Sequence, residues 1–194
     1  MSVRIDLDPA QRVTAAAVGE PGARTFYLQA RKDDVVVSLL MEKQQVALLA
    51  THIDDLLDRV GTPEEGTTPD PDVLDLEEPL TPEFRIGRIG LGYDGDRDLV
   101  LLQCDEFESA DDDEDATDEA LGDEPIEFDE GAERDDLGRV RLWATRAQMF
   151  ALARRGEREV AGGRPVCSMC GQPIDPEGHF CPRSNGHREV TKLA

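Results

Sequence analysis

Histidine and aromatic side chains are scarce in this chain of 194 residues. Aromatic residues make up 5% of it, and two of its three histidines lie close to cysteines near the C-terminus. The chain therefore has too few histidines to favour a histidine-based catalytic site, because such a site needs a histidine placed beside its substrate or nucleophile. The sequence also has no Walker lysine loop, no G-x-S-x-G elbow and no H-E-x-x-H motif, so we expect that it is not an enzyme.

Long hydrophobic runs are missing as well. No apolar stretch approaches the roughly 18 residues that a membrane-spanning helix needs. No signal peptide is recognisable at the start of the sequence. These two observations predict a cytoplasmic protein with no membrane partner.

Positive charge is in short supply, and the excess of negative charge is concentrated in one segment. The formal net charge is −22, and residues 105–136 hold 18 acidic side chains and a single basic one, Arg134. Like charges at this density repel, and few apolar side chains offset the entropy of ordering, so we predict a disordered acidic loop over 105–136. A strongly acidic chain repels phosphate backbones, which argues against direct nucleic-acid binding.

Three of the four cysteines lie within fifteen residues near the C-terminus. Cys167 and Cys170 form a C-x-x-C pair, and Cys181 follows His179 by two positions. Thiolates and imidazoles this close in sequence usually hold a metal, and Cys3His is a common ligand set for structural zinc. We predict a structural Zn²⁺ bound by Cys167, Cys170, His179 and Cys181. His187, six residues after Cys181, is the alternative fourth ligand.

Other interpretations of the cysteines are weaker. A disulfide with a spare thiol requires an oxidising compartment, whereas cytosolic thiols stay reduced. A thioredoxin-like redox role needs the C-x-x-C motif between a strand and a helix, and here Pro165, Pro173 and Pro176 surround it. The fourth cysteine, Cys104, lies in an apolar run, and we expect it to be a small buried residue.

The order of periodic segments predicts an α+β fold of antiparallel sheets with two packed helices, plus a small C-terminal module resembling a zinc ribbon. Apolar residues at three- and four-residue steps predict helices over about 43–60 and 145–160. Alternation and β-forming residues predict strands over 3–7, 12–18, 25–30, 35–40, 84–90, 98–104 and 139–144. The glycines of 90–95 match G-x-G-x-x-G, but a strand follows where a dinucleotide site needs a helix, so we interpret this run as a hairpin.

These elements divide the chain into four predicted parts. They are a first strand–helix half over 1–61, a proline-rich acidic linker over 62–83, a second strand–helix half over 84–161 that contains the acidic loop, and a zinc-binding module over 164–194. Residues 40–50 and 143–153 share a basic residue, a glutamine and an apolar pattern when aligned from Leu40 and Trp143. This internal similarity suggests two pseudo-duplicated β-β-β-α halves that face one another.

Two stretches resemble an uncharacterised family of actinobacterial signature proteins. One covers 18–31 with the string VGEPGARTFYLQAR, followed by MEKQQV at 41–46, and the other covers the cysteine-rich pattern of 167–186. The resemblance spans both ends of the chain and implies no established enzyme activity. This family has been linked with ParJ-type proteins, partners of the ParA-type chromosome-segregation ATPase. The resemblance therefore implies a ParA-type ATPase as partner and control of its assembly as the role, with no contact assigned to named residues.

Together these features favour a non-catalytic cytoplasmic adaptor or regulatory protein with a structural zinc site and a protein partner. The alternative is a nucleic-acid-binding protein that uses the basic C-terminal region and is autoinhibited by the acidic loop. Residues 139–194 hold ten Arg or Lys against five acidic residues. In that alternative, phosphate contacts come from Arg154, Arg155, Arg158, Arg183 and Arg188. Neither hypothesis fixes the oligomeric state.

Overall fold

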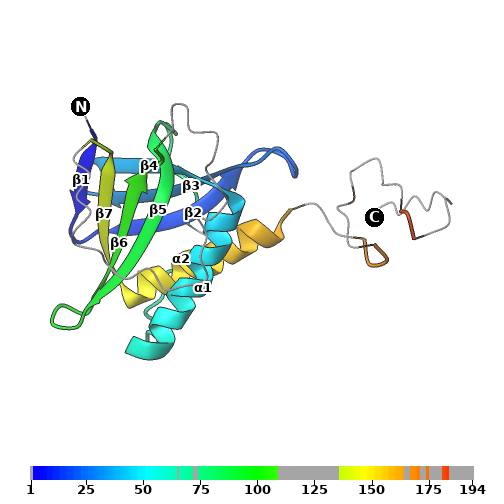
Figure 1. The fold of residues 1–194 in the computed structure, drawn as a ribbon. Helices are drawn as coiled ribbons and strands as arrows, with labels where there is room; N and C mark the ends of the chain where they lie inside the picture. Colours follow the sequence, from blue (N-terminus) through cyan, green and yellow to red (C-terminus); the bar gives the residue numbers. More distant parts are fainter. Residues whose placement is uncertain are drawn as a thin grey trace.

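A computed structural model describes residues 2–64, 66–71, 74–108, 136–163, 167–170, 174 and 181–183. In this part of the chain, seven strands and two helices form the predicted α+β fold (Figure 1). The strands are β1 (Arg4–Leu7), β2 (Arg12–Val18), β3 (Thr25–Lys32), β4 (Val35–Met41), β5 (Pro82–Asp94), β6 (Leu99–Glu106) and β7 (Arg139–Thr145). The helices are α1 (Lys43–Val60) and α2 (Arg146–Ala161).

The sheet is built from two β-β-β-α halves, as the internal similarity predicts. Strands β2, β3 and β4 are antiparallel and lead into α1, and strands β5, β6 and β7 are antiparallel and lead into α2. The halves join where β4 pairs in parallel with β5, and β1 adds to β7 in parallel. The resulting strand order is β1-β7-β6-β5-β4-β3-β2.

The two outer strands of this order, β1 and β2, are consecutive in sequence. The segment between them bonds to both ends of the sheet: the Ala10 N–H donates to the Trp143 carbonyl of β7 at 2.7 Å, and the Gln11 N–H donates to the Arg31 carbonyl of β3 at 2.8 Å. The long strand β5 also connects two parts of the sheet, because its first residues pair with β4 and the remainder pairs with β6. Single backbone hydrogen bonds from the segment between β1 and β2 therefore reach strands near both ends of the order, where edge groups need partners.

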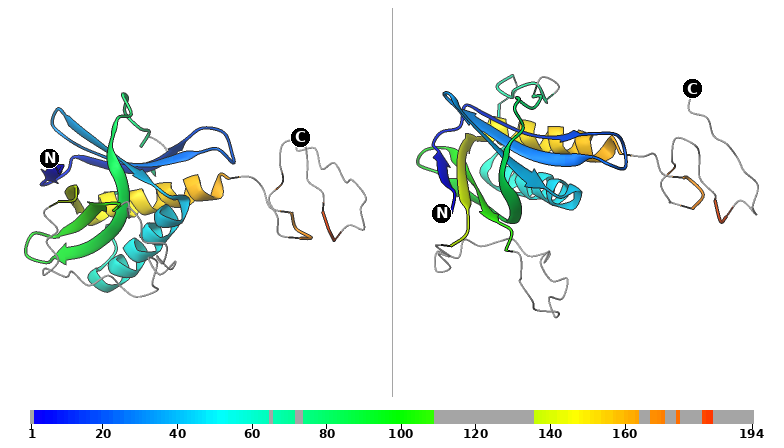
Figure 2. Two further views of the ribbon diagram at one scale, coloured as in Figure 1. Left: turned by 45° about the horizontal axis from the view of Figure 1, so that its top comes forward. Right: turned by 90° about the horizontal axis from the view of Figure 1, so that it is seen from above.

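Both helices pack side by side against the sheet (Figures 1 and 2). The predicted apolar stripe of α1 is buried and consists of Val46, Leu49, Ala50, Ile53, Leu56 and Leu57. α2 approaches α1 closely at Gly156, where an added Cβ would lie 3.0 Å from Cγ1 of Val46. In the described part of the chain, no helix is long enough and apolar enough to cross a membrane.

Each helix begins with a capping box. In α1 the N-cap is Glu42 and the third helical residue is Gln45; in α2 they are Thr145 and Gln148. In such a box the two side chains satisfy backbone N–H groups that have no partner inside the helix. The glutamine that the two similar stretches share therefore has a structural role at the start of each helix, and Thr145 caps α2.

Part of the predicted linker is packed on the sheet. Leu74 is buried, and its carbonyl accepts a hydrogen bond of 2.6 Å from the Thr14 hydroxyl of β2. The Gln29 amide of β3 bonds to both the carbonyl and the N–H of Glu77, each at 2.8 Å. We call residues 74–77 the strap, because they cross the outer face of β2 and β3.

Two strand boundaries differ by two residues from the predicted ones. β5 begins at Pro82, inside the predicted linker 62–83, and β6 ends at Glu106, inside the predicted acidic loop 105–136. The second difference has a physical cause: Asp105 is bonded to arginines of neighbouring strands, so its charge does not oppose burial in the sheet. The remainder of that loop, 109–135, lies outside the described residues.

Candidate metal centre

Three thiols converge near the C-terminus. The Sγ atoms of Cys167, Cys170 and Cys181 all lie within 4.8 Å of one another, and those of Cys167 and Cys181 are 3.8 Å apart. Tetrahedral zinc with Zn–S bonds of about 2.3 Å separates its sulfurs by about 3.8 Å. A disulfide requires about 2.05 Å. The described thiols therefore have the spacing of metal ligands, and no disulfide joins any of the described cysteines.

A turn positions the first two sulfurs. Residues 168–170 form this turn. The backbone N–H groups of Cys170 and Met169 point at the sulfur of Cys167 and lower the pKa of its thiol to about 6. The thiolate is the form that binds a metal, so the turn prepares this ligand before any ion arrives. Arg183 donates to the Met169 carbonyl at 3.0 Å and ties the arm that carries Cys181 to the turn.

The structure brings three of the four predicted ligands together. His179 and His187 lie outside the described residues, so the choice between them stays a prediction. The three cysteines can hold a metal ion, and zinc remains our prediction for its identity. Cys104 is a fully buried residue of β6, as expected, and burial raises the pKa of its thiol far above the ordinary value.

Comparison with known proteins identifies the family. A family model described as "Protein of unknown function (DUF3090)" matches residues 5–181. The chain belongs to this family. The match runs from β1 to Cys181 and confirms the predicted membership of an uncharacterised family. Searches of curated proteins and of solved structures gave no match.

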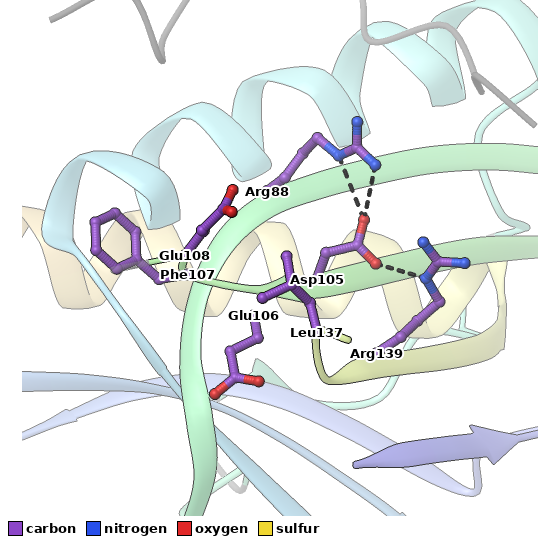
Figure 3. Close-up of a pocket in the computed structure, with 8 residues that line it drawn as sticks. Arg88, Asp105, Glu106, Phe107, Glu108, Leu137 and Arg139 are labelled. Atoms are coloured by element: carbon purple, nitrogen blue, oxygen red, sulfur yellow. Dashed lines mark hydrogen bonds and ion pairs between the residues drawn. The ribbon is translucent and has the colours of Figure 1, made fainter. Parts of the chain in front are cut away.

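The DUF3090 chain also has a charged cluster that our sequence analysis did not single out. It lies where β5, β6 and β7 meet, beside a hollow of about 420 Å³ (Figure 3). Asp105 accepts hydrogen bonds from Nη2 of Arg88 at 3.1 Å and from Nε of Arg139 at 2.6 Å. Burial by itself raises the pKa of Asp105, but these two arginines outweigh it and hold the pKa below the usual value.

The signal for this cluster was present in the sequence. Asp105 is in register with Arg88 on one side and with Arg139 on the other. Opposite charges directly across a strand pair stabilise that pairing. The three residues could have been recognised as neighbours only after β6 had been extended to include Asp105.

Proposed function

We propose that this DUF3090 chain is a non-catalytic adaptor or regulatory protein whose C-terminal segment is held by a structural zinc ion. The convergence of the sulfur atoms of Cys167, Cys170 and Cys181 carries this proposal. With His179 or His187 as the fourth ligand, protein atoms fill all four positions of a tetrahedral ion. Such a closed shell leaves no place for water or substrate, and zinc then stabilises the fold instead of activating a reactant.

We further propose that the protein acts in the cytoplasm. Three neighbouring cysteines can serve as zinc ligands only while they remain thiolates, and a reducing compartment keeps them so. The 3.8 Å separation of the Cys167 and Cys181 sulfurs agrees with that state.

The charged cluster beside β6 supports binding more than catalysis. A carboxylate held ionised by two guanidinium groups is a weak base at neutral pH, because its pKa is depressed and its oxygens are already bonded. Asp105 is therefore suited to fixing arginines in place. Fixed arginines are a recurrent means of recognising acidic partners.

The partner that we propose is a protein, and the resemblance carried by 18–31 and 167–186 implies a ParA-type ATPase. The test is to follow the assembly of a purified ParA-type ATPase by light scattering, with and without the full chain. We expect an equimolar amount of the chain to change the extent of assembly. Unchanged assembly, together with no partner crosslinked in native lysate, would rule out this regulatory role.

The nucleic-acid alternative has less support. Arg154 is paired with Asp54 and, at 2.9 Å, with Glu157. Arg155 is paired with Glu159 at 3.0 Å, and its side chain is mostly buried. A phosphate would have to displace these carboxylates. Deletion of 108–134 tests the alternative, which requires that salt-sensitive DNA or RNA binding emerge in the deleted form.

A further inference from the structure

Three buried polar side chains form one row beneath the strap. Among the described residues, the buried polar or charged ones are Thr14, Gln29, Ser38 and Asp105. Thr14 of β2 stands opposite Gln29 of β3, which in turn stands opposite Ser38 of β4. A segment that served only to stabilise the sheet would gain most by covering apolar side chains, because burial of polar groups is not favourable in itself. The row is suited instead to hydrogen bonding with an extended chain.

The strap uses this row as a bound peptide would. The Thr14 hydroxyl donates to the Leu74 carbonyl at 2.6 Å. The Gln29 amide donates to the Glu77 carbonyl and accepts from the Glu77 N–H, so it takes the place of the backbone of a neighbouring strand. These contacts all engage backbone groups of the strap, so they do not depend on its side chains.

The face beneath the strap is cationic. Strands β2, β3 and β4 contain no acidic residue, although the chain has 43 of them. Arg12 and Arg31 lie on this face, and among the described residues both form an ion pair with the Glu77 carboxylate, at 3.1 and 3.5 Å. The sheet supplies no carboxylate here, so a chain that binds this face must bring its own.

The strap leaves part of this binding capacity unused. The Nε atom of Arg31 is buried without a hydrogen-bond partner, while 42% of the side chain is exposed. The Asp75 side chain is 80% exposed, and Leu74 is the one buried residue of the strap. A buried donor without a partner costs free energy. A segment that bonds both Nε and Nη of Arg31 therefore fits this arginine better than the strap does.

We propose that the strap is a built-in occupant of a peptide-binding face, and that an extended acidic segment of a partner protein displaces it. The incoming segment pairs its backbone with Thr14 and Gln29 and places a carboxylate between Arg12 and Arg31. Bidentate binding to Arg31 supplies the contacts that the strap lacks. This inference rests on the adaptor function proposed above: it names the surface that the adaptor uses and the contact that keeps this surface closed until the partner arrives.

A peptide with the sequence of 73–80 is the probe, because the strap shows that this sequence fits the face. Fluorescein-labelled Val-Leu-Asp-Leu-Glu-Glu-Pro-Leu is titrated with the full chain and followed by fluorescence anisotropy. We expect saturable binding that is weakened by the chain's own strap, because only the fraction of molecules with an open face can bind. The same peptide with Asn and Gln in place of Asp and Glu should not bind.

Variants of the strap and of the face should change the affinity in opposite directions. Glu77→Gln should strengthen peptide binding about tenfold, because it removes the charged hydrogen bonds that hold the strap closed. In that open background, Arg31→Ala should weaken binding about tenfold. Glu78→Gln is the matched control, since Glu78 is an exposed carboxylate at the next position. It should bind the peptide as the unmodified chain does.

Hydrogen exchange measures the displacement itself. The Glu77 N–H donates to the Gln29 side-chain oxygen at 2.8 Å, which slows its exchange with solvent. Saturating peptide should speed exchange within 74–77 of the unmodified chain, as followed by mass spectrometry. This measurement needs no variant, so it decides the matter even if Glu77→Gln does not fold. Bound peptide without faster exchange in 74–77 would place the peptide at another site.

Other results would also overturn the inference. They are an absence of saturable binding in Glu77→Gln, an equal change of affinity in Glu77→Gln and Glu78→Gln, and undiminished binding after Arg31→Ala. Dimerisation of Glu77→Gln, seen by light scattering, would assign the face to the strap of a second copy. None of these variants alters a cysteine or histidine, so a failure here is distinguishable from a failure of the zinc proposal.

Discussion

Gln45 and Gln148 occupy equivalent positions in the two halves, and each side chain donates a hydrogen bond to the backbone of the other half. The Gln45 amide donates to the Ile86 carbonyl of β5 at 3.0 Å, and the Gln148 amide donates to the Ala10 carbonyl before β2 at 3.1 Å. The oxygen of each side chain also accepts from the N–H of its own N-cap residue, at 2.8 and 2.9 Å. One side chain thus begins a helix and joins that helix to the other half.

Removing either glutamine should therefore cost more than a cap alone. We expect Gln45→Ala and Gln148→Ala each to lower the free energy of unfolding by about 1–2 kcal/mol, measured by urea denaturation. Gln44→Ala, at an exposed position of the same helix, is the control and should change stability little. An equal loss in the control would mean that the glutamine bonds contribute nothing specific.

Asp105→Asn tests the charged cluster through its pH dependence. The pKa of Asp105 is lowered in the folded protein, since Arg139 and Arg88 outweigh its burial. Its ionised form therefore adds stability above the unfolded pKa of about 4, and that contribution disappears as the pH falls through the lower folded pKa.

We accordingly expect Asp105→Asn to cost about 2 kcal/mol at pH 7 and progressively less below about pH 4. Denaturation curves at a series of pH values give this difference directly. Asp96→Asn, in the exposed turn between β5 and β6, should show no such trend. A cost that is constant from pH 7 to pH 3 would contradict the assigned ion pairs.

Gly156 reports on how closely α1 and α2 approach. Alanine is favoured over glycine inside a helix by up to about 1 kcal/mol. At this site, however, its Cβ would lie 3.0 Å from Cγ1 of Val46. We expect Gly156→Ala to destabilise the protein by about 1 kcal/mol, and to stabilise it by a similar amount in a Val46→Ala background. A double-mutant cycle by thermal or urea unfolding decides the matter, and the same sign in both backgrounds would disprove the close contact.

Thiol reactivity separates the clustered cysteines from Cys104. In the folded, metal-free chain we expect three thiols to react with Ellman's reagent, because Cys104 is fully buried in β6. Zinc should protect those three, and Cys104 should react only on unfolding. The Cys104→Ala variant confirms the assignment if it loses only the slow thiol. Fast reaction of all four cysteines, or no protection by zinc, would contradict the site.

Local patterns in the sequence predicted the helices and strands of this fold. The order in which the strands pair depends on residues that are far apart in sequence, and it could not be predicted. The alternation of residues 3–7 and the apolar stripe of 46–57 can be seen in short stretches of sequence, so β1 and α1 were predicted correctly. The pairing of β1 with β7 joins residues more than 130 positions apart, and no local pattern encodes it.

The candidate site divides in the same way. Cys167, Cys170 and Cys181 could be predicted because metal ligands recur at short spacings, and the structure brings their sulfurs together. Asp105 was assigned to the acidic loop because its sequence neighbours are acidic, whereas its partners Arg88 and Arg139 come from other strands. The charges of a residue's sequence neighbours therefore do not reveal which opposite charges lie beside it on adjacent strands of a sheet.

The most direct test of the account is the metal content of the purified full chain, combined with X-ray absorption at the zinc edge. The account predicts one zinc per chain, bound by three sulfur atoms and one nitrogen atom. Loss of the nitrogen ligand in His179→Ala, with His187→Ala unchanged, would identify the fourth residue. A purified chain that contains no metal while its C-terminal segment stays folded, or a zinc ion that carries a water oxygen in place of a fourth protein ligand, would contradict the structural role proposed here.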